Sequence, residues 1–229
     1  VLCGDAPFMD AETIQHALTM HEQQGNAVTV ITAELDQPHG YGRILRTETG
    51  IAGIVEEKDA TEEQRRIQEV NSGAYWFRTA DLIALLDTLE PSNAQGEYYL
   101  TDTVGAAIAA GKRAGAYKTK NADVVLGANT RKDLLMLNEV ARQKILDKHM
   151  ENGVNFVCTD GILIGRDVEI GAETTILPGT IIKGKTKIGM KSTIGPNCLI
   201  ENCSIGDLVT LNYVQAYESL IEDAVKIGP

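Results

Sequence analysis

The chain has 229 residues, of which 43% are hydrophobic, and a formal net charge of -11 at pH 7. This composition is typical of a globular protein, and the length allows one ordinary core and a smaller second one. The negative charge argues against nucleic acid and anionic membrane surfaces as partners, and no stretch approaches the ~20 uninterrupted apolar residues of a membrane helix.

The cysteines and the two ends of the chain indicate the cellular setting. The four cysteines show no CxxC spacing and no accompanying histidines, so we expect reduced, mostly buried thiols and no metal ligation. No signal peptide is visible, the chain opens on an apolar segment without Met, and it stops within a repeat at Ile227-Gly228-Pro229. We therefore expect an internal piece of a longer cytoplasmic protein.

Residues 1–130 alternate between strand-like and helix-like segments. In chain order the pattern predicts a strand over 1–3, a helix from an Asp10 N-cap to Gln23, a strand over 27–33, and a hairpin of 42–47 and 51–56 around a turn at 48–50. It continues with a polar helix at 60–68, a strand at 72–77, helices at 82–89 and 101–112, and strands around 116 and 124–125. Such alternation indicates an α/β sheet, in which ligands collect at the carboxyl ends of strands.

Residues 131–150 form one long predicted helix, which we assign to a connecting arm; an ordinary packing helix of the first domain fits the pattern equally well. After Asn152 the apolar period becomes six. The recurring aliphatic residues are Ile164, Ile170, Ile176, Ile182, Ile188, Ile194 and Ile200, several of them followed by Gly. Ile205 comes one residue early, and Leu211 and Ile227 carry the pattern onward. This spacing is typical of a triangular β-solenoid, so we assign 151–229 to its first coils.

Six short segments of residues 1–130 and the adjoining turn carry candidate chemistry. They are Gly4-Asp5-Ala6-Pro7, His39–Arg43, Ile54–Ala60, Glu69–Gly73, Asn93–Asp102 and Leu126–Arg131. Each has an ordinary explanation by itself: a solvated loop acid, a hairpin lead-in, a charged strand end, a turn, a helix start with Thr101 as its cap, and a strand-to-helix turn. Their order is specific. Followed by a helical arm and hexads, they resemble the N-acetylglucosamine-1-phosphate uridyltransferase family, in which the same chain continues into a glucosamine-1-phosphate acetyltransferase.

The resemblance covers nearly all of the chain and implies its fold and its site. The fold implied is an α/β nucleotidyltransferase domain, Rossmann-like and N-terminally truncated, over 1–130, followed by the arm at 131–150 and a left-handed parallel β-helix of hexapeptide repeats over 151–229. Asp5 and Asn129 resemble the protein ligands of the catalytic Mg²⁺, and Gly4 lies where the family's backbone passes the nucleotide ribose. The N-acetylglucosamine-1-phosphate contacts implied are Gly42, Glu56, Asn71, Tyr99 and Thr101.

The chemistry of the implied reaction agrees with these residue types. The substrates would be UTP and N-acetylglucosamine-1-phosphate, and the sugar phosphate is already an anion at neutral pH. Attack on the α-phosphorus then needs alignment and charge neutralisation rather than a strong general base, so we name no catalytic side chain. Aspartate and asparagine oxygens suit a hard cation, and Glu56 and Asn71 suit hydrogen bonds to hydroxyl and acetamido groups. The resemblance also implies a homotrimer assembled through the β-helix.

Two departures from the family limit what this chain does alone. The family's Gly-rich, basic L-A-A-G-x-G-T-R-M loop, which holds the triphosphate, does not occur here. The histidines, His16, His21, His39 and His149, all precede the hexads, so residues 151–229 offer no histidine base for acetyl transfer. We expect this chain alone to be inactive. Two alternatives stay open: a glucose- or mannose-1-phosphate nucleotidyltransferase with a β-helix tail, and a non-catalytic trimerisation or regulatory module.

Overall fold

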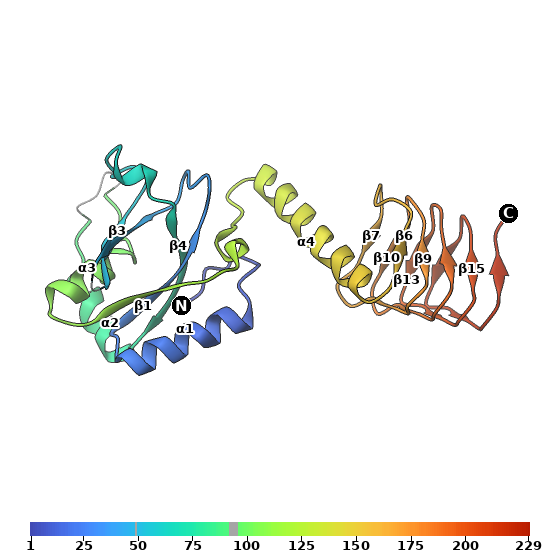
Figure 1. The fold of residues 1–229 in the computed structure, drawn as a ribbon, viewed down its shortest axis with the longest axis horizontal. Helices are drawn as coiled ribbons and strands as arrows, with labels where there is room; N and C mark the ends of the chain where they lie inside the picture. The colour runs from blue at the N-terminus through green and yellow to red at the C-terminus, as the bar shows by residue number, and fades with distance from the viewer. Residues whose placement is uncertain (49, 92–95) are drawn as a thin grey trace. The chain divides into compact units, whose positions relative to one another are not determined.

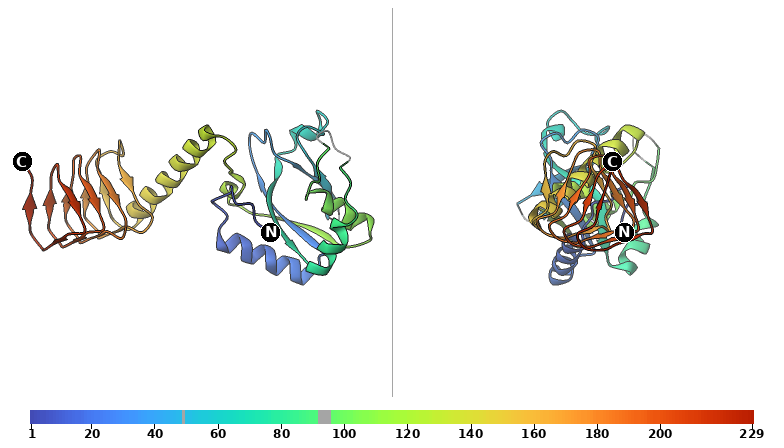
Figure 2. Two further views of the ribbon diagram at one scale, coloured as in Figure 1. Left: turned by 180° about the vertical axis from the view of Figure 1, so that it is seen from behind. Right: turned by 90° about the vertical axis from the view of Figure 1, so that its right-hand side faces the viewer.

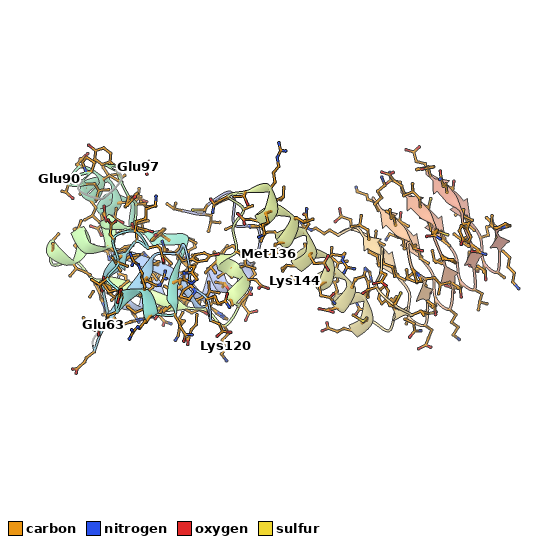
Figure 3. All side chains as sticks on the ribbon, turned by 90° about the horizontal axis from the view of Figure 1, so that it is seen from above. Glu63, Glu90, Glu97, Lys120, Met136 and Lys144 are labelled. Carbon is orange, nitrogen blue, oxygen red and sulfur yellow. The ribbon has the colours of Figure 1, made fainter. Side chains whose placement is uncertain are left out.

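The structure, a computed structural model, describes residues 1–48, 50–91 and 96–229 (Figure 1). These residues form two compact units, Val1–Leu134 and Leu135–Pro229. Within the described ranges, no helix has the length and apolar character needed to cross a membrane. The negative charge lies at the surface: Glu63, for example, is exposed and projects away from the ribbon in Figure 3.

A five-stranded sheet organises the first unit. Its strands are β1 (Val28–Glu34), β2 (Arg43–Thr47), β3 (Gly50–Val55), β4 (Glu69–Phe77) and β5 (Ala114–Lys118), in the order β3-β2-β4-β1-β5. The β1–β5 pair is parallel, whereas β1–β4, β2–β4 and β2–β3 are antiparallel. All residues of β1 except Glu34 are buried, as expected of a central strand covered on both faces.

Helices cover both faces of this sheet. On one face α1 (Ala11–Gln24) packs Ala17 against Ile31 of β1. On the other face α2 (Thr79–Leu86) and α3 (Asp102–Ala109) contribute Leu85 and Val104 to a cluster that includes residues of β1. The predicted N-cap of α1 is confirmed, because an Asp10 carboxylate oxygen accepts the backbone N–H of Thr13 at 2.6 Å.

Three predicted elements of the first unit are wrong, and each error has a physical cause. Residues 1–3 form no strand, because Val1 exchanges backbone hydrogen bonds only with Tyr75. Residues 60–68 contain only a single 3₁₀ turn, η1 (Gln64–Arg66), which buries no side chain and so lacks the apolar face that stabilises a longer helix. The apolar pair at 124–125 lies in η2 (Ala122–Val125), where it is buried as a turn rather than as a strand.

The long helix α4 (Arg131–Glu151) leads into the second unit. Leu146 near its end is fully buried and belongs to the solenoid's aliphatic cluster. The Arg142 guanidinium donates to the carbonyl of Thr159 at 3.1 Å, which ties the helix to the first coil. These contacts, all within Leu135–Pro229, make the second part of α4 a cover for one end of the solenoid.

The second unit is the predicted left-handed parallel β-helix, with three parallel sheets (Figure 2). One sheet contains β7 (Leu163–Ile164), β10 (Ile181–Lys183), β13 (Leu199–Glu201) and β16 (Gln215–Tyr217). The second contains β8 (Glu169–Ile170), β11 (Lys187–Ile188), β14 (Ser204–Ile205) and β17 (Leu220–Ile221). The third contains β6 (Asn155–Phe156), β9 (Thr175–Ile176), β12 (Thr193–Ile194), β15 (Thr210–Leu211) and β18 (Lys226–Ile227). Hexad residues stack directly: Ile164 lies beside Ile182, and Ile182 beside Ile200.

The shortened hexad at Ile205 is absorbed without loss of register. Ile188 pairs with Ile205 and Ile194 with Leu211, so the inward stack continues although the coil is a residue shorter. The corners supply the adjustment. At one of them Asn202 adopts a left-handed φ of 54°, and its side-chain oxygen accepts the backbone N–H of Lys185 at 3.0 Å. An ideal Cβ on Gly184 would lie 2.1 Å from that oxygen, which explains the glycine there.

Candidate active site

A pocket of about 520 Å³ opens in the first unit beside the end of β3 and the start of α3. It is lined by Ile54, Val55, Glu56, Asp59, Thr88, Leu89, Glu90, Tyr99, Asp102 and Ala106. Two predicted sugar-phosphate residues, Glu56 and Tyr99, are among them. Asn93, Ala94 and Gln95 of the predicted motif lie outside the described residues. The volume suits a small polar ligand.

Glu56 is a carboxyl group of this pocket with a perturbed pKa. Burial raises its pKa, the nearby Thr101 hydroxyl opposes this rise, and the charges of Asp102 and Asp59 add to it. Thr101 occupies the N-cap position of α3, but its side chain makes no capping hydrogen bond, so the interpretation of Thr101 as a cap is wrong. Its buried hydroxyl oxygen has no hydrogen-bond partner of normal geometry among the described residues. The hydroxyl thus lies close enough to Glu56 to affect its pKa, beside any group that Glu56 binds.

Gly42 and Asn71 lie on the other side of Glu56. An ideal Cβ on Gly42 would lie 3.1 Å from a carboxylate oxygen of Glu56, a tight contact that leaves little room for a side chain. The carbonyl oxygen of Gly42 accepts the backbone N–H of Asn71 at 2.9 Å. The Asn71 side-chain oxygen in turn accepts the N–H of Gly73 at 2.9 Å. Gly42, just before β2, thus lies beside Glu56, just after β3, and beside the backbone of Asn71 in β4.

The two predicted metal ligands lie on neighbouring loops. The backbone oxygen of Asp5 accepts the N–H of Ala128 at 3.2 Å, and a carboxylate oxygen of Asp5 is 3.7 Å from an ideal Cβ on Gly127. Asn129 follows immediately, its backbone N–H held by Asp133 at 3.2 Å. Asp5 and Asn129 are both exposed oxygen donors. The described residues contain no cluster of three or more His, Cys, Asp or Glu that could hold a metal. Two hard donors with open space fit Mg²⁺, which keeps several waters and phosphate oxygens as ligands.

Gly4 stands apart from the sugar-phosphate cluster. It is exposed, and no heavy atom lies within 4 Å of an ideal Cβ placed on it. Its neighbour Cys3 lies against β4, where its thiol donates to the carbonyl of Gly73 at 3.2 Å. Gly73 has a φ of 75°, and a Cβ there would approach the Cys3 sulfur to 2.8 Å. The segment before Asp5 therefore runs along the edge of β4, close to the backbone of Asn71.

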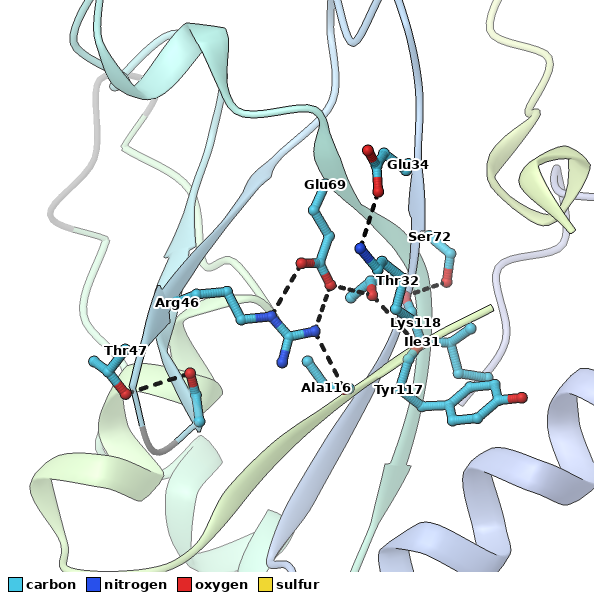
Figure 4. A network of polar contacts seen from close by, with 11 residues as sticks. Ile31, Thr32, Glu34, Arg46, Thr47, Glu69, Ser72, Ala116, Tyr117 and Lys118 are labelled. Carbon is cyan, nitrogen blue, oxygen red and sulfur yellow. Dashed lines mark hydrogen bonds and ion pairs between the residues drawn. The ribbon is translucent and has the colours of Figure 1, made fainter. Parts of the chain in front are cut away.

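Two polar networks of this unit were not found from the sequence. Figure 4 shows Arg46 of β2 holding the Glu69 carboxylate through Nε at 3.0 Å and Nη2 at 2.6 Å, while the Thr32 hydroxyl donates to the same carboxylate at 2.6 Å. The second network surrounds Arg43, whose side chain is only 1% exposed. Its only signal in the sequence was the position of an arginine directly after Gly42.

The cysteines also differ from the sequence prediction. All four are free, but only Cys198 and Cys203 are buried, whereas Cys3 is exposed and Cys158 is half-buried. The two buried thiols lie inside the solenoid, where they take inward positions between isoleucines. They therefore serve as small apolar residues of that core.

Comparison with known proteins places this chain in a family. Residues 1–153 match the family described as nucleotidyl transferase. The whole chain is 44% identical over 230 residues to the bifunctional protein GlmU of Acetivibrio thermocellus, and 46% identical over 229 residues to that of Fervidobacterium nodosum. In each case the chain spans about half the length of the curated relative, at 50%.

Among solved structures, a putative glucose-1-phosphate thymidylyltransferase from Bacillus anthracis, in complex with a sucrose, aligns with a TM-score of 0.47 and 22% identity. That alignment covers 62% of this chain and 53% of the other. The match over residues 1–153 and the whole-chain likeness to the curated relatives agree with the order of the site segments. The chain belongs to the nucleotidyl transferase family.

Proposed function

We propose that this chain supplies the sugar-phosphate and metal-binding half of a uridyltransferase site. The reaction of the whole protein would be uridyl transfer from UTP to N-acetylglucosamine-1-phosphate, giving UDP-N-acetylglucosamine and pyrophosphate. The observation that supports this most is the convergence of Gly42, Glu56 and Asn71 beside a pocket of about 520 Å³. The curated relatives are named bifunctional proteins. We propose that the whole protein also has glucosamine-1-phosphate acetyltransferase activity, carried by residues outside these coils.

The residues of the pocket have the chemistry to bind and orient a sugar phosphate. Ionised Glu56 accepts hydrogen bonds from sugar hydroxyls, and the amide of Asn71 suits the acetamido group. Tyr99 lines the pocket, and the Thr101 hydroxyl beside Glu56 offers a further donor. Asp5 and Asn129 would hold Mg²⁺, which would neutralise phosphate charge when bound. Gly4, in the turn before Asp5, would let the nucleotide ribose pass close to the backbone.

We expect this chain alone to bind the sugar phosphate but not to convert it to product. The basic Gly-rich loop that holds the triphosphate in the family is absent from the sequence. Without those contacts the UTP phosphates are neither aligned nor neutralised, and alignment accounts for much of the rate of phosphoryl and nucleotidyl transfer. We therefore expect no pyrophosphate release from UTP by this chain alone.

Calorimetry with the 229-residue chain tests the proposal directly. N-acetylglucosamine-1-phosphate should bind, and glucose-1-phosphate and mannose-1-phosphate should bind at least about tenfold more weakly, because an acetamido hydrogen-bond partner would be left unpaired. Equal or better binding of a sugar phosphate without the acetamido group would favour the alternative nucleotidyltransferase. No binding of any sugar phosphate would favour the non-catalytic module. Pyrophosphate release from UTP by the chain alone would contradict the proposed inactivity.

We also propose that the whole protein is a cytoplasmic homotrimer that assembles through the β-helix. Leu163, Ile181 and Leu199 stack in register on the outward side of one sheet, and Leu163 is 49% exposed. An aliphatic ladder on one face of a solenoid favours contact with further copies. Sedimentation of the chain should give a trimer that Leu163→Glu dissociates, whereas Lys187→Glu on another sheet should leave it intact. A wild-type monomer at tens of micromolar concentration would contradict the proposal.

A further inference from the structure

Among the described residues Arg43 is the largest side chain that is fully buried, and its guanidinium joins three segments of the chain. Nη2 donates to a carboxylate oxygen of Glu57 at 2.6 Å and to the carbonyl oxygen of Arg65 at 3.4 Å. Nη1 donates to the carbonyl oxygen of Tyr41. A buried arginine with a single carboxylate partner is costly to hold unless the geometry of its contacts is well formed.

The carboxylate partner is itself adapted to the pair. Burial opposes the ionisation of Glu57, but the hydrogen bond and the charge of Arg43 outweigh it and hold the pKa of Glu57 below its ordinary value. The backbone carbonyl of Glu57 also accepts from Nε of Arg65 at 3.4 Å. Arg43 and Arg65 therefore bind the same residue: Arg43 donates to the Glu57 carboxylate, and Arg65 donates to the Glu57 backbone carbonyl.

The contacts of Arg43 and Arg65 with Glu57, which we call the clamp, lie next to the pocket, but none of these three residues lines it. Arg43 pairs with Val55 at the last register position of the β2–β3 hairpin, so Gly42 and Glu56 lie just beyond the paired residues. Glu56 and Glu57 begin the turn that follows β3. Arg43 holds the Glu57 carboxylate, and the neighbouring Glu56 carboxylate lies 3.1 Å from an ideal Cβ on Gly42, the residue before Arg43.

We propose that Arg43 is a positioning residue of the sugar-phosphate pocket: by tying these three segments together it holds the Glu56 carboxylate against Gly42. This role rests on the proposed function and adds a residue that does not itself touch the sugar. The guanidinium presents five donors in fixed, planar directions, whereas an ammonium has three on one atom, so lysine at this position would keep the charge but lose part of the clamp. Glu56 would then move relative to Asn71.

Steady-state kinetics of the full-length protein carrying Arg43→Lys test this role. We expect KM for N-acetylglucosamine-1-phosphate to rise roughly tenfold or more, the order of effect that a misplaced binding group has. KM for UTP should change less than about twofold, because the clamp faces the sugar side of the site. Glu57→Gln should show the same pattern as Arg43→Lys, a raised KM for the sugar phosphate and a nearly unchanged KM for UTP, since it weakens the same clamp without removing the arginine.

The matched control is Arg46→Lys on the same strand. Arg46 also makes a forked pair with a carboxylate, that of Glu69, but it does not line the pocket. Arg46→Lys should lower the thermal midpoint yet leave both KM values within about twofold of the wild type, as expected for a structural pair away from the site. If Arg43→Lys fails to fold, Glu57→Gln decides the question.

The outcomes separate this proposal from the function on which it rests. A wild-type protein that does not use the sugar phosphate would overturn the proposed function. A wild-type protein that uses it, while Glu57→Gln and Arg43→Lys change stability as Arg46→Lys does without a selective rise in the sugar-phosphate KM, would overturn the positioning role alone. A selective rise in both clamp variants supports it.

Discussion

Glu56 and Glu57 are adjacent in the chain, but their carboxyl groups have opposite surroundings. Burial beside Thr101 raises the pKa of Glu56, whereas Glu57 is paired with the Arg43 guanidinium and its pKa is lowered despite burial. One carboxyl group therefore faces the pocket beside the acids Asp59 and Asp102, where it can accept hydrogen bonds from a ligand. The other is committed to the clamp. The two carboxyl groups belong to adjacent residues at the start of the turn after β3, and each meets different partners there.

Binding of the sugar phosphate should depend on the protonation of Glu56. Because its pKa lies above the ordinary value of 4.5, Glu56 takes up a proton at a higher pH than an ordinary glutamate, and the protonated group accepts fewer hydrogen bonds. We expect affinity, measured by calorimetry, to fall as the pH is lowered towards and past that raised pKa. Glu56→Gln should bind more weakly and lose this step while keeping the one due to the ligand's own phosphate. A wild-type profile identical to that of Glu56→Gln would contradict the prediction.

Gly42 should tolerate no side chain without loss of affinity. A Cβ at this position would lie 3.1 Å from the Glu56 carboxylate and from Ile54, so Gly42→Ala displaces Glu56. We expect roughly a tenfold loss of N-acetylglucosamine-1-phosphate affinity. Gly105→Ala is the control, because that helical glycine has open space around it and alanine there should stabilise the fold by about 0.5–1 kcal/mol. Equal affinity in both variants would show that the contact is unimportant.

Helix α1 owes its starting point to a single side chain. The Asp10 carboxylate accepts from the Thr13 backbone at 2.6 Å and from the Asn121 side chain at 2.7 Å, so it joins α1 to the loop before η2. These hydrogen bonds hold the pKa of Asp10 below its ordinary value, although burial opposes them. A helix that covers one whole face of the sheet is thereby held at its first turn.

Removing this cap should cost a moderate and measurable amount of stability. Asp10→Ala should lower the free energy of unfolding by about 1 kcal/mol, read from the denaturant midpoint, whereas Asp10→Asn should retain most of it because asparagine also caps helices well. The wild-type contribution follows the lowered pKa: it is present above the unfolded value near 3.8 and is lost as the pH falls through the folded one. The difference between wild type and Asp10→Ala should therefore shrink in strong acid. A constant difference across that range would contradict the assignment.

At the scale of the whole molecule, two different periodicities build two units with separate cores. The first unit packs helices on a mixed sheet, and the second stacks hexad residues such as Ile182 and Ile194 in three columns. Both of these isoleucines have no exposed surface. Each coil buries its aliphatic residues only against its neighbours, so the solenoid has no other source of core packing.

Damage to the solenoid should leave the sugar-phosphate pocket intact. Ile194→Ala should destabilise Leu135–Pro229 by about 2–5 kcal/mol, the usual cost of deleting a buried aliphatic side chain, as measured by hydrogen exchange or denaturant. Thr193→Ala on the outward side of the same strand should cost less than about 0.5 kcal/mol. N-acetylglucosamine-1-phosphate affinity should change in neither variant. Loss of that affinity in Ile194→Ala would contradict the independence of the two cores.

The sequence alone was sufficient for the solenoid, for α1 and for the composition of the site segments, because these depend on local spacing. A hexad places every sixth side chain inward whatever its neighbours are, and Asp10 caps a helix through residues three positions away. The family resemblance could likewise be read from the order of short segments. The sequence failed at 60–68 and at 124–125, where apolar or helix-favouring residues carry no periodicity long enough to discriminate.

Only the tertiary structure decided which polar groups meet. The sheet order places Gly42 beside Glu56, which lines the pocket, and beside the backbone of Asn71, and it buries Arg43, although arginine is nearly always exposed. In the same packing the Thr101 side chain makes no capping hydrogen bond, although its position before α3 suggested one. Such contacts join residues distant in the chain, and their energies depend on burial and geometry that no local pattern encodes.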